Sequence, residues 1–325
     1  MKAIVFSQYG ERDVLQHKEV DKPVPADDEL LIRVHATSLN DWDWGFMRGK
    51  PFVIRLMFGL RKPKVHIPGV DVAGRVEAVG RDVTKFQPGD EVYGDLSENR
   101  FGGFAEYVCA SETGVVRKPA GMTFEQAASI PHAAMLAKQG LIDSGQIQSG
   151  QKILINGAGG GVGTLGIQIA RLYDVHVTGV DSAEKADMLT SLGYDRVLDY
   201  RQTDFTREKK QYDLILDVKT NRPPSRYAGS LRKGGRYVTA GGSMPRLFQV
   251  FVSAPFISLL RRKTVRVVAL KPNRDLSYIN ELFDAGKLKP VIDGPYQLSD
   301  IPELMQYFGQ GKHQGKIVVL IKVEG

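Results

Sequence analysis

A glycine-rich turn is the stretch of this sequence whose residue types point most directly to chemistry. Residues 158–163 read Ala-Gly-Gly-Gly-Val-Gly, and an acidic residue, Asp181, follows about twenty positions later. A backbone without side chains can approach a pyrophosphate closely, and a helix that begins at such a turn directs its positive end towards the phosphates. A carboxylate at the end of the following strand accepts hydrogen bonds from ribose hydroxyls. The spacing therefore predicts a dinucleotide-binding turn.

The residues on either side of the turn predict the strand and the helix that must position it. Residues 152–156, Lys-Ile-Leu-Ile-Asn, form a short apolar run that is typical of a parallel strand covered on both faces. After the turn, apolar residues recur at helical spacing, at Val162, Leu165, Ile169 and Tyr173. Tight turns alone account for many glycine clusters, but here strand, turn, helix and acidic residue all agree with dinucleotide binding.

The composition predicts an ordinary globular protein with room for two domains. Of its 325 residues, 42% are hydrophobic and 25% are charged. The single cysteine, Cys109, excludes an internal disulfide and fits a reducing compartment. The apolar run at the start of the chain is too short for a signal peptide, so we expect a cytoplasmic protein. The net charge of +7 suits an anionic cofactor, and no motif for nucleic-acid binding is present.

The sequence pattern changes near residue 120. Before this point, short strands alternate with Gly and Pro, which favours a compact β-barrel or sandwich with one helix at 41–48. After it, Thr123 and Gln126 fit a capping box, and strands then alternate with helices as in a doubly wound parallel sheet. The strands expected in the first part are 2–6, 29–35, 72–79, 91–93 and 104–108. Those expected in the second part are 152–156, 176–180, 196–198, 212–218, 236–240 and 265–270.

The tail and two helices of the second part have their own signals. Pro223 and Gly234 would bound one helix, and Ser182 would cap another that ends at Gly193. An amphipathic helix at 276–285 precedes a strand, a helix and a final strand at 316–322. We expect this tail to rejoin the first domain.

Four further motifs resemble a known enzyme family. They are Asn-Asp-Trp-Asp-Trp running on to Arg-Gly at 40–49, Ile-Pro-Gly-Val-Asp-Val-Ala-Gly at 67–74, Pro-Gly-Asp-Glu-Val-Tyr-Gly at 88–94, and Gly-Gly-Phe-Ala-Glu-Tyr at 102–107. With the alanine-first turn, they resemble the medium-chain dehydrogenase/reductases over nearly the whole chain, and in particular their zinc-independent quinone oxidoreductase branch.

The resemblance implies an α/β fold with two domains. A GroES-like β-barrel catalytic domain would span 1–118, a doubly wound Rossmann domain that binds the cofactor would span 119–272, and residues 273–325 would return to the catalytic domain. It also implies an active site in the cleft between the domains and, as in many members, a homodimer.

The resemblance also suggests roles for residues in the first domain. Asn40 would lie near the nicotinamide and the reacting carbonyl, where its amide would donate to a developing oxyanion. A turn-forming or helix-capping asparagine is the other interpretation of this residue. Trp44 and Tyr93 would line the substrate pocket, although both also suit packed core aromatics. Asp43 and Arg48 are expected to form an ion pair or another structural contact.

Residues that could bind zinc are scattered along this sequence. Alcohol dehydrogenases of the superfamily hold a catalytic zinc with Cys and His ligands that converge on the metal. Here Asn40-Asp41 and Pro68-Gly69-Val70-Asp71 stand in the corresponding segments, and no cysteine cluster follows. The histidines at 35, 66 and 132 are better explained as structural residues. We therefore expect no metal site.

A site without a metal favours reduction over alcohol oxidation, because nothing lowers the pKa of an alcohol hydroxyl. A nicotinamide hydride can add to a quinone or to the β-carbon of an enone, while protein donors stabilise the new oxyanion. We therefore predict an NADPH-linked reductase of a small lipophilic quinone or α,β-unsaturated carbonyl. The alternatives are an enoyl-thioester reductase, which would need a tyrosine-like donor where Phe46 stands, a zinc alcohol dehydrogenase, and a non-enzymatic NADPH- or nucleic-acid-binding relative.

Two signals differ on the choice of nicotinamide cofactor. Asp181 favours NAD(H), because a carboxylate there repels a 2′-phosphate. Ser182, Lys185 and Tyr200 instead match positions at which NADPH-specific members of the family hold that phosphate, and they favour NADP(H). Leu136 stands where the branch usually has a threonine near the nicotinamide, which leaves one cofactor hydrogen bond in question. The complete predicted cofactor set is Ala158, Gly159, Gly160, Gly161, Val162, Gly163, Asp181, Ser182, Lys185, Tyr200 and Gly241.

Two segments, 50–64 and 244–263, combine bulky apolar residues with positive charge. A loop packed over the cleft and a helix at the dimer contact are the simpler interpretation. A lid for a lipophilic substrate, or a patch that contacts membranes, is the sharper hypothesis and the less favoured one.

Overall fold

The computed structural model describes residues 1–98, 101–242 and 244–322. The chain divides into two units: unit 1 contains Met1–His132 and Lys271–Gly325, and unit 2 contains Ala133–Leu270. Within the described ranges, no helix combines the length and the apolar character that crossing a membrane requires.

The division after His132 lies beyond the change of sequence pattern near residue 120. The reason is the helix α3 (Phe124–Ala128), which packs on strands of unit 1. The ring of Phe124 stacks on His35, with 4.3 Å between the ring centroids. The capping box predicted for this helix is present: the Gln126 N–H donates to Thr123 Oγ1 (3.2 Å), and the Thr123 N–H donates to Gln126 Oε1 (2.9 Å).

Unit 1 is built on a seven-stranded sheet in which most neighbours are antiparallel. The strand order is β14-β15-β3-β4-β5-β7, β6 pairs with the first half of β3, and β15 pairs with its second half. Because β15 pairs with β3, the C-terminal segment is part of unit 1. A separate two-stranded sheet joins β1 and β2. The strands are β1 (Lys2–Val5), β2 (Gln16–Glu19), β3 (Glu29–Ser38), β4 (Asp71–Val79), β5 (Glu91–Asp95), β6 (Tyr107–Ser111), β7 (Val116–Arg117), β14 (Ile292–Gln297) and β15 (Lys316–Leu320).

Strand β6 lies later in the chain than the predicted strand at 104–108. The residues before it bond elsewhere: the Ile4 N–H donates to the Phe104 carbonyl (2.9 Å), and the Phe104 N–H donates to the Pro68 carbonyl (3.0 Å). Only from Tyr107 onward does this segment pair with β3. The prediction was wrong here because these long-range partners leave no local signal.

Besides α3, the described part of unit 1 contains the helices α1 (Asp41–Arg48), α2 (Phe52–Phe58), α9 (Leu276–Asp284) and α10 (Ile301–Gly309). The predicted helix at 41–48 is confirmed as α1, and Gly49 ends it with a φ of 59°. The helix expected before the final strand is α10, and its Ile301, Leu304 and Met305 are buried in the core of unit 1.

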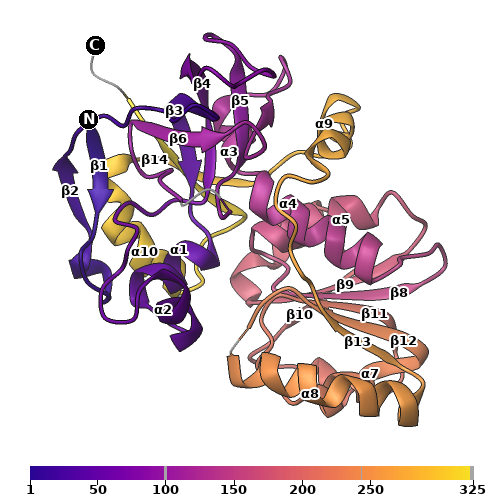
Figure 1. Ribbon diagram of the computed structural model, residues 1–325. Coiled ribbons are helices and arrows are strands. Elements are labelled where there is room, and N and C mark those ends of the chain that lie inside the picture. Colours follow the sequence, from indigo (N-terminus) through magenta and orange to yellow (C-terminus); the bar gives the residue numbers. More distant parts are fainter. Residues whose placement is uncertain (99–100, 243, 323–325) are drawn as a thin grey trace. The chain divides into compact units, whose positions relative to one another are not determined.

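Unit 2 is a six-stranded parallel sheet in the order β10-β9-β8-β11-β12-β13. Figure 1 shows α4 and α5 on one face of this sheet and α7 and α8 on the other, as in a doubly wound fold. The strands are β8 (Lys152–Asn156), β9 (His176–Asp181), β10 (Arg196–Asp199), β11 (Tyr212–Asp217), β12 (Leu231–Thr239) and β13 (Thr264–Val267). The helices are α4 (Pro131–Lys138), which continues as a π-helical turn to Ser144, α5 (Gly161–Ala170), α6 (Ala186–Ser191), α7 (Pro224–Ser230) and α8 (Met244–Arg261).

Two local predictions in unit 2 need correction. The helix predicted to run to Gly234 ends at Ser230, because Leu231 already pairs with Tyr212 of β11 and so starts β12. Ser182 precedes a short 3₁₀ turn before α6, but its side chain does not cap that turn. Gly193 does follow α6, with a φ of 98° that favours glycine.

Candidate functional site

The glycine turn of unit 2 connects the carboxyl end of β8 to the first turn of α5. Ala158, Gly159 and Gly163 are buried, whereas the residues from Gly160 to Val162 are half-exposed and face outward at the helix start. A Cβ on Gly163 would lie 2.3 Å from the Ala158 carbonyl oxygen, so only glycine lets α5 sit this close to the turn. The first N–H groups of a helix lack intrahelical partners, and here they belong to the exposed part of the turn. This bare backbone suits a pyrophosphate.

Asp181 lies at the end of β9, as predicted, and its charge is already compensated. Its carboxylate accepts hydrogen bonds from the Gly159 N–H (2.8 Å) and the Ser182 N–H (2.9 Å). Lys185 Nζ lies 3.4 Å from its Oδ1, and both side chains are largely buried. The stem of Lys185 crosses the turn, so a Cβ on Gly159 would lie 2.4 Å from Lys185 Cδ. Asp181, which favours NAD(H), and Lys185, which favours NADP(H), therefore form one ion pair.

A second ion pair stands beside Tyr200, which is exposed after β10. Arg201 donates to Glu184 (2.5 Å) and lies over the Tyr200 ring, 5.5 Å from its centroid. Arg201 was missed by sequence reasoning, although a basic residue directly after Tyr200 was a signal for it. Gly241 follows β12, and its carbonyl accepts a hydrogen bond from Thr239 Oγ1 (2.8 Å). A small cavity of about 40 Å³ opens at the ends of β8 and β9, lined by residues that include Asn156, Val180 and Tyr200.

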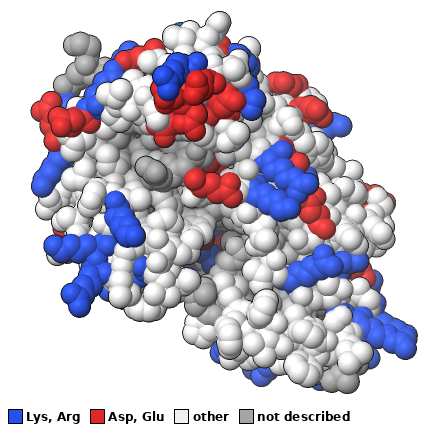
Figure 2. Space-filling model, in the orientation of Figure 1, with Lys and Arg blue, Asp and Glu red and all other residues white. Residues whose placement is uncertain are grey.

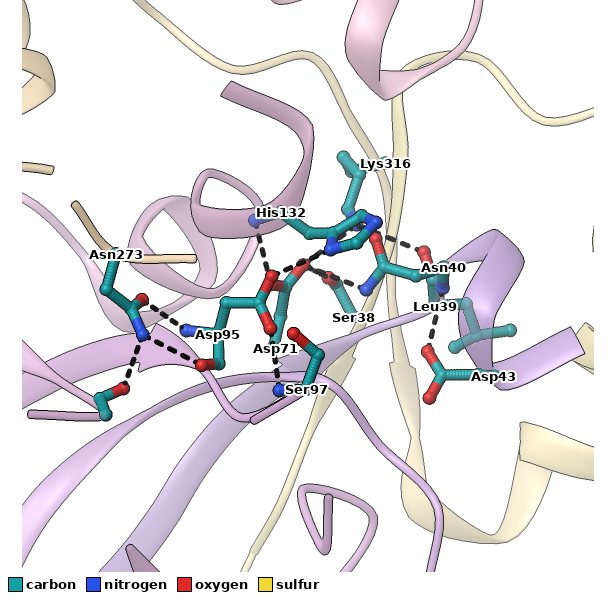
Figure 3. A network of polar contacts seen from close by, with 11 residues as sticks. Ser38, Leu39, Asn40, Asp43, Asp71, Asp95, Ser97, His132, Asn273 and Lys316 are labelled. Carbon is teal, nitrogen blue, oxygen red and sulfur yellow. Dashed lines mark hydrogen bonds and ion pairs between the residues drawn. The ribbon is translucent and has the colours of Figure 1, made fainter. Parts of the chain in front are cut away.

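Unit 1 contains a buried network centred on Asp71 of β4 (Figure 3). Asp71 Oδ2 accepts from Ser38 Oγ (2.8 Å), Asn40 Nδ2 (3.0 Å) and Lys316 Nζ (2.9 Å). Lys316, at the start of β15, also donates to Asn40 Oδ1 (2.5 Å) and to the Leu39 carbonyl (3.1 Å). All three protons of its ammonium group are therefore used, and the lysine compensates the charge of Asp71.

A histidine–carboxylate pair continues this network. His132 Nδ1 lies 2.7 Å from Asp95 Oδ2, and the His132 backbone N–H donates to Asp71 Oδ1 (3.0 Å). Burial alone would lower the pKa of His132, but the Asp95 carboxylate outweighs it and the pKa is raised. The hydrogen bond to Asp95 fixes the ring and places the second ring nitrogen, Nε2, on its other side. His132, which the sequence favours as a structural residue, is therefore buried and held in orientation by Asp95.

Asp43 is the third buried carboxylate of this region. Its Oδ2 accepts from the Asn40 N–H (2.9 Å) and its Oδ1 from the Gly69 N–H (3.0 Å). Burial and the nearby charge of Asp71 raise the pKa of Asp43 to about 7. The contact predicted between Asp43 and Arg48 is not an ion pair: Arg48 instead donates to Glu11 (3.1 Å) and stacks on Trp44.

Each predicted catalytic or pocket residue of unit 1 has a hydrogen-bond or packing partner within the unit. Asn40 is the residue before α1, so it fits the helix-cap interpretation, and its amide links Lys316 to Asp71. Trp44 packs against α10, where a Cβ on Gly309 would lie 2.6 Å from its ring. Tyr93 is fully buried, and its hydroxyl donates to Asn280 (2.5 Å). These contacts favour the core interpretation of Trp44 and Tyr93 over the pocket interpretation.

Among the described residues, no group of three His, Cys, Asp or Glu side chains converges as metal ligands do. Cys109 of β6 is half-buried, and burial raises the pKa of its thiol to about 11, which suits a structural role. Leu136 is buried in α4 and brings no hydrogen-bonding group to that position.

Comparison with known proteins identifies both parts of the chain. The model of the alcohol dehydrogenase GroES-like domain matches residues 26–120, and that of the zinc-binding dehydrogenase matches residues 192–319. The GroES-like match and the parallel sheet of unit 2 confirm the predicted fold class.

Several curated proteins are similar along nearly the whole chain. The chloroplastic quinone-oxidoreductase QR1 of Triphysaria versicolor is 34% identical, over 98% of this chain and 98% of its own. The chloroplastic NADPH-dependent alkenal/one oxidoreductase of Arabidopsis thaliana is 32% identical, over 98% of this chain and 79% of its own. Among solved structures, the quinone oxidoreductase from Coxiella burnetii superposes with a TM-score of 0.87 at 28% identity, with 99% of each chain covered.

Proposed function

Because the chain belongs to the medium-chain dehydrogenase/reductase superfamily, in its quinone oxidoreductase-like branch, we propose that it reduces a quinone or an α,β-unsaturated carbonyl with NADPH. The observation that carries this proposal is the bare glycine turn at the start of α5, backed by an acidic residue at the end of β9. Relatives named as quinone and alkenal/one oxidoreductases support the acceptor class. A bound nicotinamide would supply the hydride.

We assign the proton of this reaction to His132. Reduction of a quinone or enone leaves an oxyanion that must be stabilised or protonated. Asp95 holds Nδ1 of His132 and favours its protonated form, so Nε2 carries a proton that can be donated. Asn40 has one amide proton beyond the one that it gives to Asp71, and this proton would assist. Lys316 and Asp71 act through these groups by holding Asn40 and the His132 backbone in place.

We further propose NADP(H) as the preferred cofactor, with NAD(H) as the weaker one. Lys185 and two backbone N–H groups compensate Asp181, which weakens its repulsion of a 2′-phosphate. Arg201 and Lys185 bring two cations to this side of the turn, and Ser182 and Tyr200 lie beside them. Arg–phosphate contacts are among the strongest hydrogen bonds available to a protein.

Three more features remain proposals. Reduction without zinc is supported by the absence of converging metal ligands among the described residues. A homodimer and a cytoplasmic location are predictions from the family resemblance and from the single cysteine. The enoyl-thioester alternative is weakened because Phe46, in the position of the needed donor, is buried in the core.

The decisive experiment follows the absorbance of NADPH when the protein is mixed with NADPH and a quinone, an enal or an enone. The reverse reaction is followed as formation of NADPH from NADP⁺ and a simple alcohol. We expect oxidation of NADPH with acceptors of the first three kinds, little reaction with alcohols, and no change after treatment with a zinc chelator. A purified protein that binds NADPH but reduces none of these acceptors contradicts the proposed function.

The residue assignments need their own variants. His132→Gln keeps a side chain that can bond to Asp95 but cannot donate a titrating proton, so kcat should fall by ~100-fold while the KM for NADPH stays unchanged. His66→Gln, at an exposed histidine, is the matched control. Arg201→Ala should raise the KM for NADPH but not for NADH, whereas Arg207→Ala, at another exposed arginine, should change neither.

A further inference from the structure

The glycine turn of unit 2 is flanked by two lysine side chains, one from each side of its strand. The turn follows β8, which pairs with β9 on one side and with β11 on the other. Lys185, after β9, crosses the turn at Gly159. Lys219, two residues after the end of β11, crosses it at Gly157, where a Cβ would lie 3.2 Å from Lys219 Cγ and 3.8 Å from its Cε. Of the two lysines, only Lys185 was predicted from the sequence to bind the cofactor.

The backbone hydrogen bonds around Lys219 hold this residue beside the turn. The Lys219 N–H donates to Asp217 Oδ1 (2.9 Å). The Val218 N–H donates to the Asn156 carbonyl at the end of β8 (3.0 Å). Gly157 has a φ of 88° and no Cβ, which leaves the space into which the side chains of Val218 and Lys219 pack. The end of β11 therefore fixes the position of Lys219 along the turn.

The positive charge of Lys219 is not compensated, in contrast to that of Lys185. Lys185 Nζ lies 3.4 Å from the Asp181 carboxylate. Figure 2 shows that other cations are paired too, since several blue Lys and Arg groups adjoin red Asp and Glu groups on the visible face. Lys219 is exposed, and its ammonium group has neither a hydrogen bond nor an ion pair with any of the described residues. Its charge is therefore available to an anion that is not part of the chain.

The anion that fits this position is the diphosphate common to NADH and NADPH. The half-exposed residues 160–162 present the first N–H groups of α5 to it. The residues proposed to hold a 2′-phosphate, including Lys185 and Arg201, belong to the side of β9 and β10, whereas Lys219 comes from β11, on the opposite side of β8. An ammonium group there adds a charge-assisted contact that both cofactors share.

We propose that Lys219 is a cofactor-binding residue that contacts the diphosphate of the nicotinamide dinucleotide from the β11 side of the turn. The lysine thereby strengthens the binding of NADPH and NADH equally, and the residues on the β9 side decide between the two. This inference rests on the proposed use of a nicotinamide cofactor, but not on the acceptor or on the assigned proton donor.

Nucleotide titrations of the full chain, without an acceptor, test the proposal. The fluorescence of NADPH and NADH gives their Kd values, and ADP-ribose and 2′-AMP are measured by displacement of NADPH. Lys219→Met keeps the stem of the side chain over Gly157 but removes its charge, so the Kd values for NADPH, NADH and ADP-ribose should each rise by ~10-fold. The Kd for 2′-AMP, which lacks the diphosphate, should stay unchanged.

Two further variants serve as controls. Lys219→Arg keeps the positive charge, so each Kd should stay within ~3-fold of that of the unchanged chain. Lys152→Met, at an exposed lysine at the opposite end of β8, lowers the net charge by the same amount and should leave every Kd unchanged. Without nucleotide, Lys219→Met should keep the thermal midpoint of the unchanged chain, because its packed stem is preserved and the lost charge is exposed.

Three results overturn the inference. The first is a Lys219→Met variant that binds NADPH and NADH as tightly as the unchanged chain does. The second is a rise in Kd confined to NADPH, because the lysine would then contact the 2′-phosphate. The third is an equal effect of Lys152→Met, because the nucleotides would then respond to net charge alone.

Failure of the proposed function gives a different result. An unchanged chain that binds both nucleotides but reduces no acceptor contradicts the proposed reaction, while the Kd values of Lys219→Met still decide the diphosphate contact. An unchanged chain that binds neither nucleotide overturns both.

Discussion

Two buried carboxylate networks, one in each unit, differ in what neutralises them. In unit 1, Asp71 and Asp95 are paired with Lys316 and His132, and Asp43 lies beside them. In unit 2, Asp217 at the end of β11 is reached among the described residues only by uncharged donors. They include Asn156 Nδ2 (2.7 Å), the Tyr237 hydroxyl (2.7 Å), the Lys219 backbone N–H (2.9 Å) and Thr220 Oγ1 (3.2 Å).

The network of unit 1 can therefore accommodate charged groups, whereas that of unit 2 holds neighbouring strands in place. Burial raises the pKa of Asp217, and neutral donors only partly offset this effect. Such a group ties β8, β11 and β12 together at the edge where the glycine turn begins. In unit 1, cations and carboxylates alternate, so a proton can be gained or lost near neutral pH without leaving an isolated charge. This contrast supports the proposal that the proton chemistry belongs to unit 1, while Asp217 of unit 2 positions the turn.

The largest expected effect follows removal of the lysine in unit 1. Lys316→Met keeps the length of the side chain but leaves Asp71 buried without a counter-charge, next to Asp43. Loss of one partner of a buried ion pair typically lowers the free energy of unfolding by about 3–5 kcal/mol. Urea unfolding at pH 7 measures this loss.

The control for this variant is Lys322→Met, at an exposed lysine that follows the same strand, which should change stability by less than about 0.5 kcal/mol. The double variant Lys316→Met/Asp71→Asn should cost less than the sum of its single variants, because it removes both charges. If Lys316→Met lowers the free energy of unfolding by less than about 1 kcal/mol, Asp71 does not depend on the lysine. The contrast between the two networks then fails.

The next effect concerns the pH dependence of stability. The pKa of Asp43 is raised to about 7 in the folded chain, against an ordinary value of 3.8, so the native state binds its proton more tightly. The stability that this group contributes is complete below its unfolded pKa and is lost as pH rises through 7. Between pH 5 and pH 8 the loss amounts to roughly 2.5 kcal/mol. The raised pKa of His132 acts in the same direction, whereas Asp95, whose pKa is lowered, matters only at more acid pH.

Urea unfolding between pH 5 and pH 8 checks this prediction with Asp43→Asn. Because asparagine does not titrate, the decrease in stability with pH should be smaller by that amount. Asp41→Asn, at an exposed position of the same helix, should follow the unchanged chain. Parallel pH profiles for the unchanged chain and Asp43→Asn would show that this carboxyl does not take up a proton in the window.

The fold was predictable wherever the signal is local. The strand, turn and helix from Lys152 to Ala170 follow from an apolar run, a glycine cluster and helical spacing, and the structure has each of them. The start of β12 at Leu231 was not predictable, because it depends on pairing with Tyr212, which is distant in sequence.

The candidate site was predictable in part, for the same reason. Asp181 and Lys185 are four residues apart, and the helical turn between them brings them together. Asp71 and Lys316 are 245 positions apart and meet only because β4 and β15 both pair with β3. A weak signal existed for Lys316, which is the one charged residue of the otherwise apolar strand β15 and therefore calls for a buried partner. Nothing in the sequence indicated which partner each would take.

The smallest of the three effects tests the neutral network of unit 2. Tyr237→Phe removes one donor from Asp217, which keeps the Asn156 and Lys219 donors, so we expect a loss of roughly 1.5 kcal/mol. Tyr194→Phe is the matched control in the same unit, because the buried Tyr194 hydroxyl donates to the neutral carbonyl of Gly163 (3.0 Å). We expect this substitution to lower the free energy of unfolding by only about 1 kcal/mol or less. If Tyr237→Phe instead costs as much as Lys316→Met, hydroxyl donors neutralise a buried carboxylate as fully as a cation does, and the contrast between the two units fails. A small loss, with an unchanged pH profile, means that Asp217 holds the ends of three strands in place without exchanging a proton.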